Sequence, residues 1–170
     1  MSRSLILFRH GKSDWETGVE SDHDRPLAKR GRKAARSMGR LLTALNQCPE
    51  LAVASTALRA ADTLELAATA GSWPSRRTTD RRLYESTPEA VHAFLQQFPA
   101  ELSSMMLIGH ETTWSETVAL LTGGGRLRFP TAAMARIDFA DDCWRTIQPG
   151  SGNLVWFIPP RLVTDTDLRF

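Results

Sequence analysis

Apolar residues along this chain fall into two alternating patterns, short unbroken runs and longer segments with helical spacing. The runs cover residues 4–8, 51–54 and 105–108, and polar residues follow each of them, as expected for buried strands. Residues 27–45 and 58–68 carry apolar side chains three or four positions apart, which predicts amphipathic helices. Strands alternating with helices predict an α/β domain with a largely parallel central sheet.

The second half of the chain continues this alternation. Thr87, Pro88 and Glu89 form a helix start, with a hydroxyl cap, a proline in the first turn and an early acid, so we expect a helix to about Phe98. The remaining expectations are extended or irregular chain at 75–86, a helix from Thr112 or Thr113 to Leu121, strands at 134–139 and 153–158, and another strand within 141–148.

The length and composition fit one ordinary globular domain. The chain has 170 residues, of which 42% are hydrophobic and 24% are charged. We place the domain at residues 1–158 and expect residues 159–170 to form a C-terminal surface tail. No apolar run approaches the ~20 residues of a membrane helix. Cys48 and Cys143 lack the spacing of a metal site, which favours a reduced, cytoplasmic protein without a resident metal.

Positive charge is concentrated in two segments although the net charge is only +2. Residues 25–40 contain seven basic side chains and no acidic one, and residues 76–82 hold four arginines. Such clusters form either a solvated surface or a site that attracts an anionic substrate or an acidic protein partner. The aromatic side chains that accompany basic ones in many nucleic-acid sites are missing, so we do not expect nucleic-acid binding.

Residues suited to binding an anion follow three of the predicted strands. The first strand leads into Arg9 and His10, the second is followed by Arg59, and the third leads into His110. Ligands of open parallel sheets bind outside the carboxyl ends of the strands, so neighbouring strands would bring these four side chains together. Positive groups held together repel one another unless an anion lies between them. A phosphoryl group suits the site best, because arginine matches its oxygens with paired donors.

The segments around these residues resemble the histidine phosphatase superfamily, and most closely its short SixA-type phosphohistidine phosphatases. The resemblance runs in order from about residue 4 to residue 139. It implies a phosphoglycerate mutase-like fold, a three-layer α/β/α sandwich with a largely parallel sheet. The segments that carry it read LILFRHGKSDW, DRPLAKRGRKAARSMGRLL, VASTALRAADTLELA, LYES and LIGHETTWSETVALL.

The resemblance implies a role for each residue of the cluster. His10 is the expected nucleophile, which becomes transiently phosphorylated, and Arg9, Arg59 and His110 are expected to bind the phosphoryl oxygens. Phosphoryl transfer mainly requires positioning and stabilisation of charge, and a neutral imidazole can attack phosphorus. His10 must therefore be unprotonated, whereas His110 would help most as a cation. No metal or other cofactor is required.

Two further residues are candidates for the site. Glu85 matches the acidic position of the family, which implies a general acid, although a surface glutamate before a helix is equally compatible with the sequence. Ser13 could donate a hydrogen bond to phosphate or stabilise a turn. Glu111 stands where short members usually have asparagine, and it could raise the pKa of His110 or face solvent. His23 and His92 lack a comparable context, and we assign them no role.

The expected function is hydrolysis of a phosphoryl group through a phosphohistidine intermediate. A phosphohistidine protein is the favoured substrate, because the chain between Glu85 and Leu107 has room for one helix and no long lid. A phosphatase of small phosphate monoesters and a non-catalytic phosphate-binding module are the alternatives.

Overall fold

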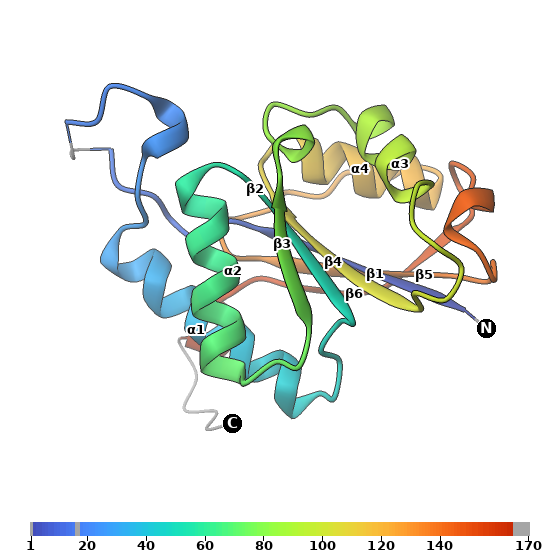
Figure 1. Cartoon of the computed structure of the whole chain (residues 1–170), viewed down its shortest axis with the longest axis horizontal. Coiled ribbons are helices and arrows are strands. Elements are labelled where there is room, and N and C mark those ends of the chain that lie inside the picture. Colours follow the sequence, from blue (N-terminus) through green and yellow to red (C-terminus); the bar gives the residue numbers. More distant parts are fainter. Residues whose placement is uncertain (1, 16–17, 165–170) are drawn as a thin grey trace.

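Six strands form one central sheet in the order β3-β2-β4-β1-β5-β6 (Figure 1). The computed structural model describes residues 2–15 and 18–164. Neighbouring strands among β1 to β4 run parallel, whereas β5 pairs antiparallel with β1 and β6. The strands are β1 (Arg3–Arg9), β2 (Leu51–Ser55), β3 (Arg76–Asp80), β4 (Ser104–Gly109), β5 (Met134–Phe139) and β6 (Gly152–Ile158).

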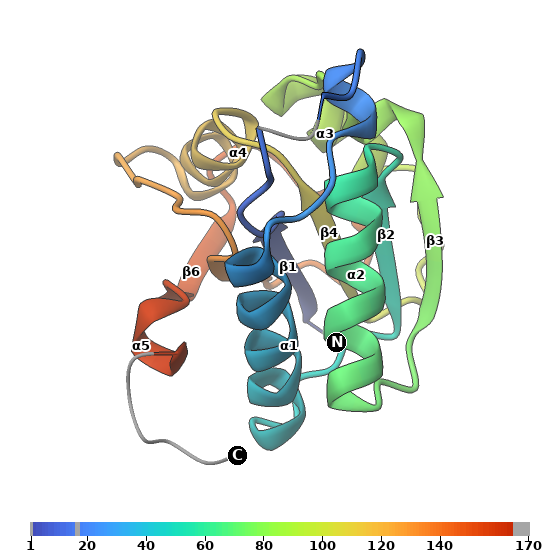
Figure 2. The same cartoon turned by 90° about the vertical axis from the view of Figure 1, so that its left-hand side faces the viewer.

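Helices cover both faces of this sheet, which confirms the predicted three-layer fold (Figure 2). Alternate side chains of β1 point to opposite faces, as strand geometry requires. Leu5 and Leu7 join one buried cluster, and Ile6 and Phe8 join the other. The helices are α1 (Lys29–Ala44), α2 (Leu58–Gly71) and α5 (Arg161–Thr164) on the Phe8 side, and α3 (Pro88–Leu95) and α4 (Thr113–Thr122) on the Leu7 side.

The register of the parallel strands brings the polar residues of the sequence to one edge of the sheet. Arg9 pairs with Gly109, so His10 and His110 follow two adjacent strands at the same level. Ala54 of β2 pairs with Ile108 of β4, so Ser55, the last residue of β2, lies at the same end of the sheet as the two histidines. The strand order therefore brings the two histidines together, as the sequence predicts.

A glycine inside α1 allows close packing of two helices. A side chain on Gly39 would place its Cβ 2.0 Å from the carbonyl oxygen of Ala67 in α2. Glycine lowers helix propensity, but here it allows the helix backbones to approach closely. The two helices consequently form a tight pair over the sheet (Figure 2).

One segment differs from the sequence-based expectations, and a second is more regular than they required. The strand expected within 141–148 is wrong, because this segment contains a 3₁₀-helix at Trp144–Thr146. Trp144 is fully buried and its indole Nε1–H donates to the carbonyl of Leu102, so a single large side chain fixes the segment. Residues 76–80, within the stretch expected to be extended or irregular, form the edge strand β3.

The C-terminal segment expected to be a surface tail begins with α5. Val163 of this helix is 8% exposed and belongs to the buried cluster that includes Phe8 and Met38. Residues 165–170 of the expected tail lie outside the described residues. A domain boundary at residue 158 stays a prediction.

Candidate active site

The imidazole of His10 lies at the carboxyl end of β1 with one nitrogen fixed and the other available. The ring is 6% exposed, and its Nδ1 lies 2.7 Å from the carbonyl oxygen of Gly11. A carbonyl only accepts hydrogen bonds, so Nδ1 carries the proton and Nε2 keeps its lone pair. The N–H of Gly11 donates to Thr63 Oγ1 of α2 at 3.0 Å, which anchors the loop that holds the ring.

Arg59, in the first turn of α2, joins the two predicted histidines. Its Nε lies 3.4 Å from His10 Nε2, and its Nη2 lies 3.3 Å from His110 Nδ1. The two imidazole rings are 5.1 Å apart between centroids. His110 Nε2 is 2.9 Å from the Ser55 hydroxyl. Since Arg59 can only donate, His110 Nδ1 accepts and its Nε2–H donates to Ser55.

Arg9, the residue before His10, lies close enough to the cluster for its charge to act on both histidines. Its Nη1 donates to the carbonyl of Phe129 at 2.6 Å, and its buried Nε has no hydrogen-bond partner among the described residues. Burial lowers the pKa of Arg9, and the nearby charge of Arg59 lowers it further. An unpartnered buried donor beside a second guanidinium is a feature that a bound anion would stabilise.

The structure adds an acidic residue that the sequence did not identify. Asp22, in the loop between β1 and α1, accepts from Arg59 Nη2 at 2.9 Å and from Arg25 Nη2 at 2.7 Å. Its backbone carbonyl accepts from Arg59 Nη1 at 2.6 Å. Partial burial alone would raise the pKa of Asp22, but the hydrogen bonds from Arg25 and the charge of Arg59 lower it. The carboxylate thus supplies part of the counter-charge that we expected from a ligand.

Two aromatic side chains border the same loop. The Tyr84 hydroxyl donates to the carboxylate of Asp22 at 3.1 Å, and its ring lies edge-on to His110 with centroids 5.5 Å apart. His23, to which the sequence gave no role, packs edge-on against Tyr84 and lies 3.0 Å from the hydroxyl of Thr56. The sequence offered one signal for Asp22, namely the cluster of cations, because a nearby acid stabilises such a cluster.

Both central histidines are neutral near pH 7. Burial lowers the pKa of His10 to about 3, and the charges of His110, Arg59 and Arg9 act in the same direction. Burial also lowers the pKa of His110 to about 4, assisted by Arg59. His10 is therefore unprotonated, as a nucleophile must be. For His110, burial and the adjacent guanidinium of Arg59 oppose the positive charge that we expect to assist catalysis, so that role stays a prediction.

These low pKa values predict acid sensitivity of the fold. The unfolded chain binds protons at His10 and His110 below about pH 6.5, whereas the folded chain binds them only near pH 3 at His10 and near pH 4 at His110. This contribution to stability is therefore complete above about pH 6.5, falls by roughly 1.4 kcal/mol per histidine per pH unit as the pH drops toward the folded pKa, and does not fall further below it. Urea unfolding across this range should show a shallower decline for His10→Asn than for the wild type. Identical slopes would contradict it.

Comparison with known proteins identifies the family of this chain. The profile of the histidine phosphatase superfamily (branch 1) matches residues 5–102, which include His10 and Arg59. The chain is a member of the histidine phosphatase superfamily. An uncharacterised protein of Mycobacterium tuberculosis is 33% identical over 164 residues, which cover 91% of this chain and 100% of the relative.

Solved phosphatase structures share the fold of this chain over nearly its full length. The protein histidine phosphatase SixA, in complex with tungstate, has a TM-score of 0.82 at 26% identity, covering 95% of this chain and 99% of SixA. The mycobacterial glucosyl-3-phosphoglycerate phosphatase with VO3 has a TM-score of 0.67 at 19% identity, covering 91% and 98% of the two chains. The second likeness shows the fold alone. Superfamily membership and the SixA likeness support phosphatase activity.

The remaining candidates, Glu85 and Ser13, differ in solvent exposure in this histidine phosphatase. Glu85 is exposed in the turn before α3, with φ at +52°, next to Tyr84. Ser13 is buried, and its hydroxyl accepts from Arg25 Nη1. Its hydrogen bond to Arg25 ties the loop after His10 to the loop of Asp22. The roles proposed for both residues stay predictions.

Glu111 does not act on its histidine neighbour as one of our alternatives supposed. Its carboxylate accepts from the backbone N–H of Ser115 in α4 at 3.3 Å, and its charge raises the pKa of Arg9 rather than that of His110.

Among the described residues, no group of three or more His, Cys, Asp or Glu side chains is placed to hold a metal ion. Within residues 2–15 and 18–164, no helix is long and apolar enough to cross a membrane.

Proposed function

We propose that this protein is a metal-independent phosphatase that acts through a phosphohistidine on His10. The Nε2 lone pair attacks phosphorus, the N–P bond forms, and the bond from phosphorus to the leaving group breaks. Water then attacks the phosphoryl group, which releases phosphate and returns the electron pair to Nε2. The observation that carries the proposal is the fixed tautomer of His10, with Nδ1–H on Gly11 and Nε2 facing Arg59.

The charges around His10 suit the transition state of this reaction. Phosphoryl transfer spreads negative charge over three equatorial oxygens. Arg59 directs its Nε toward His10 Nε2, while Asp22 holds the opposite side of the guanidinium. Arg9 and His110 border the same space, and a bound dianion would raise the pKa of His110 toward protonation. The tungstate bound by SixA, a structure with the same fold, supports a tetrahedral anion here.

The substrate we propose is a protein phosphohistidine. Only the eight-residue helix α3 and short turns lie between Glu85 and β4, so no long insertion covers the site from this segment. A phosphate monoester phosphatase is the second candidate, because a relative with the same fold carries the name of a sugar-phosphate phosphatase. A phosphate-binding module without turnover would keep the anion contacts but form no phosphoenzyme.

A substrate panel with the Glu85→Gln variant separates the first two candidates. An alkoxide leaving group needs a proton from a general acid, and losing that acid costs roughly 10²–10⁴-fold. An imidazole leaving group can already carry a proton on its other nitrogen. We therefore expect Glu85→Gln to slow hydrolysis of phosphate monoesters far more than that of a phosphohistidine peptide, measured as kcat/KM.

The matched control for this comparison is Glu89→Gln in the first turn of α3. Glu89 is exposed and lies four residues from Glu85, so the substitution removes the same charge outside the turn. Equal losses of kcat/KM on both substrates in Glu85→Gln would contradict the leaving-group role. A preference of the wild type for monoesters would favour the second candidate.

A further inference from the structure

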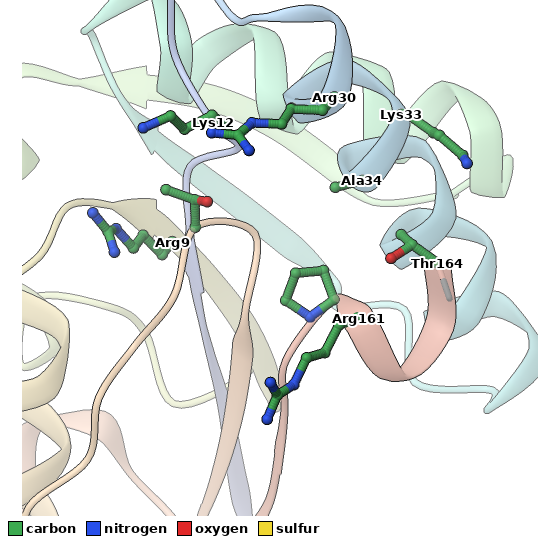
Figure 3. Close-up of a pocket in the computed structure, with 10 residues that line it drawn as sticks. Arg9, Lys12, Arg30, Lys33, Ala34, Arg161 and Thr164 are labelled. Carbon is green, nitrogen blue, oxygen red and sulfur yellow. The ribbon is translucent and has the colours of Figure 1, made fainter. Parts of the chain in front are cut away.

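A basic groove lies next to the candidate active site, between α1, α5 and the loop after β1 (Figure 3). Its volume is about 560 Å³. Five of its ten lining residues are arginine or lysine, and none of these ten is acidic: the basic ones are Arg9, Lys12, Arg30, Lys33 and Arg161. Three separate segments of the chain therefore bring positive charge to one hollow.

Among the described residues, no acidic side chain pairs with the exposed cations of this groove. Lys12, Arg30, Lys33 and Arg161 form no ion pair with any described residue. Positive charges that gather without acidic partners raise the local positive potential, because their individual potentials add. Some arginines of the chain do form ion pairs, as in Arg77 with Glu65 and Arg136 with Asp138, but among the described residues none of these pairs lies in the groove.

Arg9 and Lys12 link the groove to the segment of chain that holds His10. Arg9 lines the groove and lies beside His10, while Lys12 is two residues beyond His10 in the same loop. Figure 3 shows Arg9, Lys12 and Arg30 toward one side, with Arg161 across the hollow. A ligand anchored on His10 could extend directly into this space.

We infer that the groove binds an acidic segment of the phosphoprotein substrate, next to its phosphohistidine; this rests on the proposed function. One small anion would satisfy two or three of the cations and fill little of the volume. An extended peptide places side chains of one face about 7 Å apart, so successive acidic residues can meet cations on α1 and then on α5. Arg30, Lys33 and Arg161 are exposed, as contacts to a protein surface require.

The test reverses charge in the groove without touching the catalytic cluster. Arg30→Glu/Lys33→Glu changes two groove residues on α1. The matched control, Arg36→Glu/Arg40→Glu, makes the same change in net charge at exposed positions of the same helix outside the groove. The substrates are a phosphohistidine peptide flanked by glutamates, the same peptide flanked by glutamines, and free phosphoramidate.

We expect the wild type to prefer the glutamate peptide through a lower KM. Arg30→Glu/Lys33→Glu should lose about tenfold in kcat/KM on that peptide, which corresponds to about 1.4 kcal/mol, and less than about twofold on phosphoramidate. The control pair should stay within about twofold on all substrates at physiological ionic strength. Equal losses in the control pair, equal losses on phosphoramidate, or no preference between the two peptides would overturn the proposal.

A binding measurement keeps this test independent of turnover. A fluorescein-labelled, unphosphorylated glutamate peptide is titrated with wild type, Arg30→Glu/Lys33→Glu and the control pair, and anisotropy is recorded. Weaker binding by the groove variant alone supports the docking site even if no substrate is hydrolysed, an outcome that would sink only the proposed function. Displacement by inorganic triphosphate or tighter binding of a single-stranded RNA of equal charge would instead assign the groove to those ligands.

Discussion

Replacing His10 with asparagine is expected to reduce turnover by on the order of 10⁴-fold or more, because the variant loses its nucleophile. The shorter amide can still donate to the carbonyl of Gly11, which accepts from Nδ1 at 2.7 Å in the wild type. It has no nitrogen lone pair to offer phosphorus, so the phosphoenzyme cannot form. The anion contacts of Arg9 and Arg59 remain, and binding of phosphate should change much less than kcat.

Trapping with a labelled phosphoryl donor measures this effect directly. Wild-type protein quenched in alkaline denaturant should carry label on one histidine, and His10→Asn should carry none. His92→Asn is the control, because His92 lies on α3 and contacts the carbonyl of Ile147, away from the cluster. Unchanged hydrolysis by His10→Asn, or label that persists in it, would remove the proposed mechanism. A wild type that binds phosphate but never becomes labelled would be a binding module.

Replacing Arg59 with alanine has the second-largest expected effect, a loss of about 10²–10³-fold in kcat/KM. Arg59 contacts His10, His110 and Asp22 at once, so its guanidinium both positions the rings and faces the developing charge. Arg59→Lys should recover only a small part of the activity, because an ammonium cannot make the three contacts of a planar guanidinium.

The controls for Arg59 separate chemistry from folding. Arg77→Ala removes a guanidinium that pairs with Glu65 on the surface, and it should leave kcat/KM unchanged. Removing Arg59 also leaves Asp22 without one partner, so stability is followed by urea unfolding for both variants. If Arg59→Ala lost activity only in proportion to its unfolded fraction, a direct role in phosphoryl transfer would be excluded.

The convergence of His10, Arg59 and His110 could be predicted because it depends on short-range patterns. Each of these residues lies at a strand end or a helix start, and parallel strands align their carboxyl ends. The buried runs of β1, β2 and β4 are continuous apolar stretches, as expected for strands covered on both faces. The local hydrophobic pattern and the long-range strand pairing therefore predict the same position for these three residues.

Asp22 and Tyr84 could not be found in this way, because loops bring them to the site. Asp22 follows no strand, and its contact with Arg59 spans 37 positions of the chain. The lowered pKa of His110 was missed for a related reason, since it depends on burial and on the neighbouring Arg59. The wrong strand within 141–148 has another cause. There, the burial of one indole outweighed the local preference for extended chain.

Gly31 joins the proposed peptide-binding groove to the candidate active site. A Cβ on this residue would lie 2.1 Å from the carbonyl oxygen of Lys12, so the first turn of α1 rests directly on the backbone that follows the nucleophile. The helix carrying Arg30 and Lys33 is thereby seated on the loop carrying His10. A side chain at Gly31 would therefore displace both the groove helix and the loop of His10, whereas substitutions at exposed groove positions such as Arg30 and Lys33 leave this contact intact.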